Sequence, residues 1–150
     1  MSWNYYGLDH KAQSLVLNAK KRDLEVTEKE KKSLKQAFKM REAVAYGLER
    51  FWGEHLRLQE KEPLKSTYWK DVWDTLVEIM KQAQVTVPND TISKHNAVAD
   101  VEKMSQKFWG DVALDQEGTK FTTENQRVTL AVLTQLCDCL VWWTQRFKDV

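Results

Sequence analysis

Glycine, proline and cysteine are scarce in this sequence, and each shortage excludes a class of protein. Five glycines and two prolines among 150 residues are too few for the many tight turns of a β-sandwich or β-barrel. Two cysteines, Cys137 and Cys139, cannot supply the framework of a disulfide-rich domain. The chain also lacks a signal-peptide pattern and any apolar run long enough to span a bilayer. We therefore expect a soluble, cytoplasmic protein that makes no membrane contact.

Patterns that mark common active sites are absent as well. His10, His55 and His95 lie in separate segments without a ligand at metal-binding spacing, and neither HExxH nor CxxC occurs. In a helix, Cys137 and Cys139 would point to nearly opposite sides, so their sulfurs cannot share a metal ion or a disulfide. Glycine-rich phosphate loops and GxSxG are also missing. The sequence thus predicts no catalytic residues, no metal site and no cofactor.

What the chain does contain is apolar residues at helical spacing over most of its length, which predicts an all-α protein. Its size suits a single domain over residues 1–150, and short connections favour one antiparallel bundle of about five helices. Capping boxes at Thr27 and Thr123 mark two of the helix starts, while Gly47 and Gly53 weaken the second helix. The predicted helices cover residues 8–20, 27–59, 66–84, 90–114 and 123–148.

Positive charge is concentrated in one part of the chain, although the net charge is only +1. Between Lys20 and Arg41, nine basic residues stand against four acidic ones. Such a run is either a solvated helix face or a surface for the phosphates of a nucleic acid, which lysine and arginine neutralise. The candidate nucleic-acid-binding residues are Lys20, Lys21, Arg22, Lys31, Lys32, Lys35, Lys39, Arg41, Arg50 and Arg57.

Seven tryptophans give the chain more large apolar surface than most domains of this size carry. Trp69, Trp73, Trp109 and Trp142 stand at helical spacing within their segments and are expected mainly in the core. Trp142 and Trp143 are adjacent, so both cannot face one core. We therefore predict that this pair contributes to a protein interface.

One enzymatic pattern survives this search. Arg50 and His55 are separated by four residues, which resembles the Arg-x-x-x-x-His ribonuclease motif of the HEPN family of helical bundles. That resemblance implies an RNA-cleaving site shared between two protomers. Phe51 stands where family members usually have a polar residue. In a continuous helix the two side chains would also lie roughly 140° apart around the axis. The alternative interpretation is that Arg50 is an ordinary surface residue and His55 lies at the boundary of the core.

The closing segment, NQRVTLAVLTQLCDCLVWWTQRFKDV, is an apolar helix that ends in aromatics followed by Arg-Phe-Lys. It resembles the last helix of the small subunits of CRISPR effector complexes, the compact helical proteins that stack along Cascade and type III assemblies. In some type I systems, including type I-D, this subunit is the separately translated C-terminal part of the large subunit. The resemblance implies a structural role beside the guide RNA and its target, without catalysis.

The leading hypothesis is therefore a non-catalytic subunit of an RNA-guided complex that binds nucleic-acid backbone through basic residues, where base pairing itself reads the sequence. Its expected partners are guide RNA, target nucleic acid, other subunits and copies of itself. Two alternatives stay open: a ribonuclease that uses Arg50 and His55, and a helical adaptor that binds only protein.

Overall fold

The computed structural model describes residues 7–26, 32–92 and 97–150, and every regular element within these ranges is helical. The predicted all-α class is confirmed. One contiguous core contains buried side chains from each of the helices. In the described residues the elements are α1 (Leu8–Leu24), α2 (Gln36–Ala43), the short 3₁₀-helix η3 (Val44–Tyr46), α3 (Leu48–Leu58), α4 (Pro63–Gln82), α5 (Ala97–Phe108) and α6 (Thr123–Phe147).

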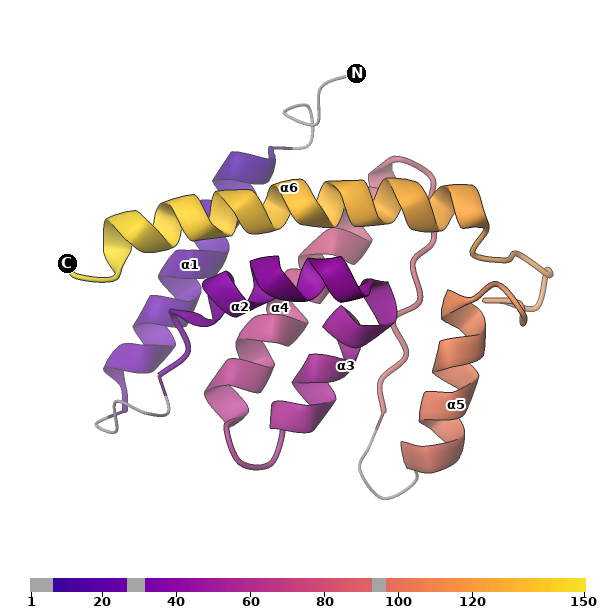
Figure 1. Cartoon of the computed structure of the whole chain (residues 1–150), viewed down its shortest axis with the longest axis horizontal. Helices are drawn as coiled ribbons and strands as arrows, with labels where there is room; N and C mark the ends of the chain where they lie inside the picture. The colour runs from indigo at the N-terminus through magenta and orange to yellow at the C-terminus, as the bar shows by residue number, and fades with distance from the viewer. Residues whose placement is uncertain (1–6, 27–31, 93–96) are drawn as a thin grey trace.

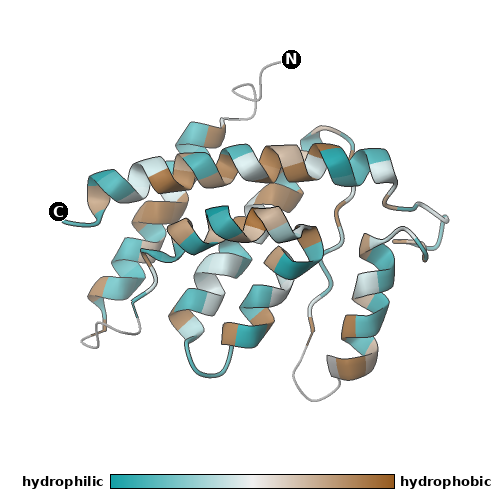
Figure 2. Cartoon of the chain, viewed as in Figure 1, coloured by the Kyte–Doolittle hydropathy of each residue, from teal (hydrophilic) through white to brown (hydrophobic). Residues whose placement is uncertain are grey.

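The helix α6 crosses the whole molecule and packs most extensively against α1 and then α2 (Figure 1). Its apolar residues lie over the central turns, where it covers the other helices, and its first turn is polar (Figure 2). The N-cap is Thr122, one residue before the predicted cap Thr123, because the hydroxyl of Thr122 accepts a hydrogen bond from the amide of Asn125 at 3.0 Å. The helix therefore joins the two ends of the molecule.

The single helix predicted over residues 27–59 is wrong. The chain forms α2, then η3, and turns at Gly47 before α3. Gly47 has φ 99° and ψ 173°, a backbone conformation that residues other than glycine rarely adopt. The predicted capping box at Thr27 lies outside the described residues. As a result, α2 packs against α6 while α3 packs against α4.

The α3–α4 hairpin holds the aromatic part of the core. Phe51 of α3 packs on Trp69 of α4 with 4.7 Å between ring centroids. Trp73 contacts Phe108 at the end of α5, with ring centroids 5.6 Å apart and the rings nearly perpendicular. Trp52 is also buried, 5.9 Å from Phe108. These rings fix the end of α5 against the hairpin.

Two further helix boundaries differ from the prediction. The helix α4 begins at Pro63, a favoured first residue, before the predicted start at residue 66. The buried hydroxyl of Ser66 donates to the carbonyl of His55 at 2.6 Å. The helix α5 is shorter than the predicted range 90–114, and Val98 near its start is 86% exposed. Asp90, outside the helix, pairs with Lys107 of α5 at 2.6 Å.

No helix in the described ranges has both the length and the apolar character that crossing a membrane requires.

Candidate nucleic-acid interface

Three lysines of the predicted basic run are exposed on and just before α2. Lys32 and Lys35 precede the helix, with Lys35 at its N-cap, and Lys39 follows Lys35 by one turn. Within the described chain, none of their ammonium groups forms an ion pair with a carboxylate. We call Lys32, Lys35 and Lys39 the lysine surface.

A hollow of about 550 Å³ lies beside the lysine surface, between the end of α1, the start of α2 and the end of α6. Lys32 and Lys35 line it, and Lys148 adds an exposed ammonium from the far end of the sequence. That ammonium lies 5.9 Å from the centre of the Phe38 ring on α2. Asp149 is the exposed acid of the lining.

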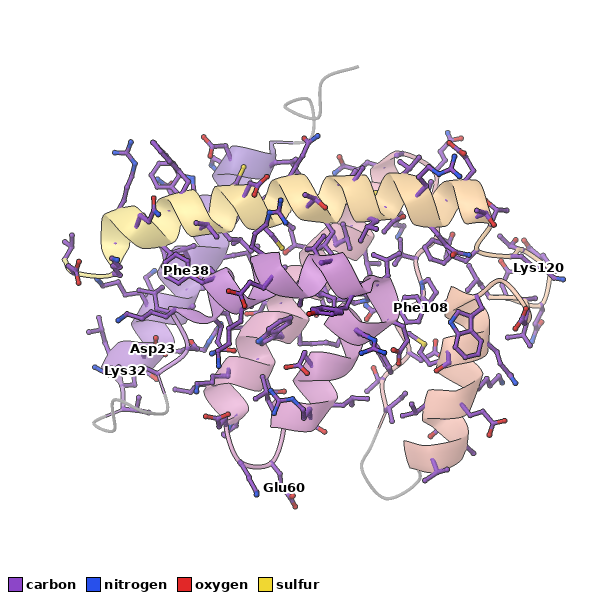
Figure 3. All side chains as sticks on the ribbon, in the orientation of Figure 1. Asp23, Lys32, Phe38, Glu60, Phe108 and Lys120 are labelled. Carbon is purple, nitrogen blue, oxygen red and sulfur yellow. The ribbon has the colours of Figure 1, made fainter. Side chains whose placement is uncertain are left out.

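Asp23 explains why the lysine surface has a defined position. Its carboxylate is buried and accepts hydrogen bonds from the amide of Ser33 at 2.8 Å, the hydroxyl of Ser33 at 2.9 Å and the amide of Leu34 at 2.8 Å. These bonds tie the end of α1 to the segment that carries Lys32 and Lys35 (Figure 3). Charge-assisted bonds of this kind are among the strongest in proteins, so the two lysines stand on an anchored backbone.

Lys20 lines the same hollow, but its ammonium already makes hydrogen bonds within the protein. Its ammonium donates to the main-chain carbonyl oxygens of Phe147, the last residue of α6, and of Val150, beyond the helix. The final carbonyls of a helix have no partner inside the helix, and a lysine side chain satisfies them well. Lys20 therefore joins α1 to α6 in addition to contributing charge.

Three predicted arginines are held in ion pairs. Arg22 of α1 contacts Asp71 of α4 at 3.0 Å, where burial raises the pKa of Asp71 and the guanidinium opposes that rise. Arg41 of α2 contacts Asp138 of α6 at 2.5 Å. In the described part of the chain the basic residues do not form the continuous face expected of one long helix, and Arg22 and Arg41 connect helices to each other. Arg57 makes two hydrogen bonds to Glu54 within α3, at 2.9 and 2.8 Å.

The remaining predicted cations lie apart from the lysine surface or outside the described residues. Lys21 is exposed on α1 but does not line the hollow. Lys31 is outside the described ranges. Arg50, on α3, lies over the ring of Tyr46 at 6.0 Å. It shares a groove of about 340 Å³ with Tyr46 and Lys39, and the carboxylates of Glu42 and Glu54 line the same groove.

Arg50 and His55, the pair of the ribonuclease alternative, do not line the same cavity. Arg50 is exposed, whereas the His55 ring is buried and donates from Nδ1 to the carbonyl of Trp52. Burial lowers the pKa of His55, so the ring is neutral at pH 7. Three or more His, Cys, Asp or Glu side chains are nowhere grouped for metal binding in the described part of the chain.

The two cysteines and the closing tryptophans follow the expected pattern of opposite faces. Cys137 is buried and Cys139 half-buried, both as free thiols. Trp142, which was expected mainly in the core, is 52% exposed, and Arg146 stacks on it at 4.8 Å. Trp143 packs against the core and donates from Nε1 to Asp9 at 2.9 Å. Of this pair, Trp142 is the one that offers a surface to a partner.

Trp109 is a candidate that sequence reasoning missed. It was expected in the core, but it is 64% exposed because Phe108 takes the buried position next to it. The reasoning that separated Trp142 from Trp143 applies equally here, since two adjacent aromatics at a helix end cannot both turn inward. The adjacent pair Phe108 and Trp109 was therefore the available signal.

Comparison of the chain with models of known protein families finds no match, and comparisons with curated proteins and with solved structures find none either.

Proposed function

We propose that this protein is a non-catalytic subunit of an RNA-guided CRISPR effector complex and that it holds nucleic-acid backbone on the lysine surface. The observation that carries the proposal is the exposed, unpaired state of Lys32, Lys35 and Lys39 within the described chain. The resemblance of the closing helix to CRISPR small subunits supplies the biological setting.

The lysine surface suits recognition through charge rather than sequence. An ammonium that contacts a phosphate releases a condensed counterion, so affinity falls steeply as salt rises. Three phosphate contacts predict a salt slope of about −2.7 on a duplex, or a roughly 40-fold loss of affinity between about 50 and about 200 mM salt. Backbone contacts position a strand without reading its bases, as a complex guided by base pairing requires.

Charge reversal of the lysine surface tests the proposal. The variant Lys32→Glu/Lys35→Glu/Lys39→Glu should bind an RNA–DNA heteroduplex more weakly and with a salt slope smaller by about one unit per lysine. Fluorescence anisotropy at several salt concentrations measures both quantities. The matched control, Lys81→Glu/Lys103→Glu/Lys120→Glu, changes the net charge equally at three exposed lysines on other parts of the molecule.

Equal losses in both triple variants would mean that net charge alone governs binding, and the lysine surface would have no special part. A protein that binds neither duplex nor single strands at low salt would remove the proposal entirely. Purification of the tagged protein from its native cells tests the setting: a guide-sized RNA should accompany the wild type and be depleted with the lysine-surface variant.

The adaptor alternative rests on a separate observation, the exposed Trp142 with Arg146 stacked on it. Large aromatics beside arginine are typical of contact hot spots between proteins. In the proposed complex this surface meets a neighbouring subunit. Trp142→Ala should then impair assembly while leaving nucleic-acid binding by the isolated protein intact. Loss of assembly in a protein that binds no nucleic acid would favour the adaptor.

A further inference from the structure

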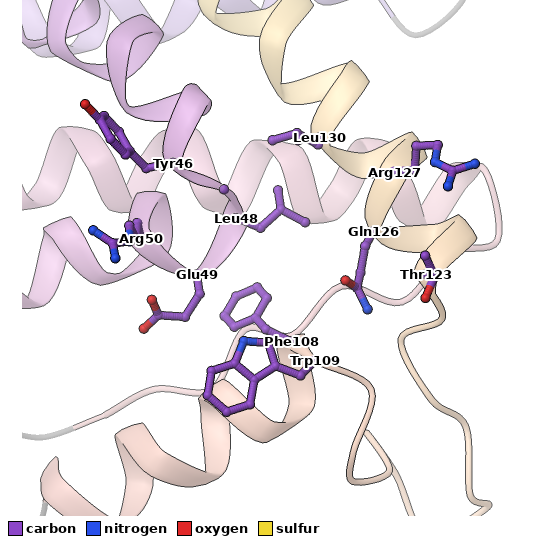
Figure 4. Close-up of a pocket in the computed structure, with 11 residues that line it drawn as sticks. Tyr46, Leu48, Glu49, Arg50, Phe108, Trp109, Thr123, Gln126, Arg127 and Leu130 are labelled. Carbon is purple, nitrogen blue, oxygen red and sulfur yellow. The ribbon is translucent and has the colours of Figure 1, made fainter.

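A second groove, of about 540 Å³, lies at the opposite end of α6 from the lysine-surface hollow. It is enclosed by the start of α3, the end of α5 and the first turns of α6 (Figure 4). Two exposed aromatic rings border it: Trp109, 64% exposed, and Tyr46, 68% exposed. We call this cavity the aromatic groove. Single exposed apolar residues are normal on a protein surface, so the informative feature is that two exposed rings border one cavity.

The backbone around Trp109 is held firmly. Phe108, the preceding residue, is locked among Trp52, Trp73 and Phe121 at ring distances of 5.6 to 6.3 Å. Gly110 follows in a left-handed conformation with φ 78°, and a Cβ there would meet the Phe121 carbonyl oxygen at 2.9 Å. Trp109 is therefore fixed on both sides in the chain and presents its ring to solvent. A main chain held in place in advance loses little further entropy when a ligand stacks on the exposed ring.

Positive charge and hydrogen-bonding groups flank the rings. Arg50 enters the lining from α3 and Arg127 from α6, where its pairing with Glu124 is loose, at 3.7 Å between exposed side chains (Figure 4). Gln126 donates from its amide nitrogen to the carbonyl of Phe121 at 3.0 Å, which orients the side chain at the groove. Glu49 supplies a carboxylate that can accept from the exocyclic amine of a base.

The aromatic groove is continuous with the lysine surface. Tyr46 and Arg50 line both this groove and the smaller one that contains Lys39. Lys39 in turn lies one helical turn from Lys35. The described surface therefore combines cations for phosphates with rings for bases, as single-strand binding surfaces do. Carboxylates lie among these groups, from Glu42, Glu49 and Glu54.

We propose that the aromatic groove binds the unpaired bases of a single-stranded nucleic acid, with Trp109 as the stacking platform and Arg50 and Arg127 contacting the flanking phosphates. This inference rests on the proposed function and names its substrate class. A paired duplex cannot use the groove, because its bases are stacked on one another. We name nucleic acid as the occupant because every base offers a ring face together with an adjacent phosphate, which the exposed rings and the two arginines at the cavity can bind together.

The test compares three fluorescent probes: an oligothymidine strand about 20 nucleotides long, an abasic strand and a duplex of equal length. Trp109→Ala should weaken binding of oligothymidine roughly tenfold, in line with the stacking of a single base. Its affinity for the abasic strand and the duplex should not change. Trp109→Phe should keep most of the affinity, and Tyr46→Ala should act in the same direction as Trp109→Ala. Trp142→Ala is the matched control, since it removes an exposed tryptophan elsewhere.

The possible results distinguish the groove inference from the lysine-surface proposal. If the wild type binds all probes with strong salt dependence and Trp109→Ala changes nothing, the groove inference is wrong while the lysine-surface proposal stands. Equal weakening on every probe would also overturn the stacking role. If Trp109→Ala instead alters the mass of the protein in solution, the groove is a contact for protein. Absence of all nucleic-acid binding by the wild type would remove both proposals together.

Discussion

Replacing Gly47 by alanine should measure how strongly the fold depends on the break between α2 and α3. Gly47 has φ 99° and ψ 173°, and a Cβ at this position would meet no atom within 4 Å. The penalty therefore comes from the backbone conformation alone, about 1–3 kcal/mol. Alanine also restricts the unfolded chain, which offsets about 0.4–1 kcal/mol. The free energy of unfolding should fall by about 1–2 kcal/mol, which for this size corresponds to a Tm lower by about 3–8 °C.

Gly53→Ala is the matched control for this experiment and should have the opposite sign. Gly53 lies inside α3, and its Cβ would lie no closer than 4.0 Å to the Glu49 carboxylate. Alanine in a helix interior is favoured over glycine by about 0.5–1 kcal/mol, so this variant should be more stable than the wild type. Urea denaturation and thermal unfolding followed by circular dichroism measure both variants. A Gly47→Ala protein that is stabilised and more helical would refute the reasoning, because α2 and α3 would then have merged.

Two further predictions concern buried polar groups. Asp23→Ala should lower the free energy of unfolding by about 2–4 kcal/mol, because it removes three hydrogen bonds to a charged acceptor and leaves the amide of Ser33 unpaired. Arg57→Ala, which breaks an exposed pair, should lower it by less than about 1 kcal/mol, and equal losses in urea denaturation would contradict the anchoring role of Asp23. Burial lowers the pKa of His55 in the folded protein below its ordinary 6.5. Near and below pH 6.5 the unfolded chain therefore binds more protons than the folded one. The free energy of unfolding should fall as the pH decreases from about 7 to about 5.5, by up to about 1.4 kcal/mol per pH unit. His55→Gln should flatten that dependence in the same titration, and an unchanged slope would show that other groups cause it.

The helical class and most of the core could be predicted because apolar spacing is a local property of the chain. Phe51, Trp69 and Leu136 follow that spacing and are buried. The break at Gly47 could not be predicted in the same way, because Gly53 looks equivalent in the sequence. The difference lies in tertiary packing: α2 is covered by α6, whereas Phe51 directs α3 toward α4.

The candidate site was predictable only in part. Charge counting found Lys32, Lys35 and Lys39, but it also included Arg22 and Arg41, which bind acids that stand far away in the sequence. Ion pairs between helices depend on the fold and leave no local pattern. The aromatic groove combines α3, α5 and α6, so no single stretch of sequence contains it.

The packing of α6 on α1 has a consequence for the order in which the protein folds during synthesis. These two helices form the most extensive contact between helices in the described structure, yet more than a hundred residues separate Leu8 from Thr123. The α3–α4 hairpin can form from local contacts as soon as it leaves the ribosome, whereas contacts between distant segments form more slowly. Until α6 has been translated, the face of α1 that packs on it lacks its cover, and the nascent chain exposes an apolar face of the kind that chaperones bind.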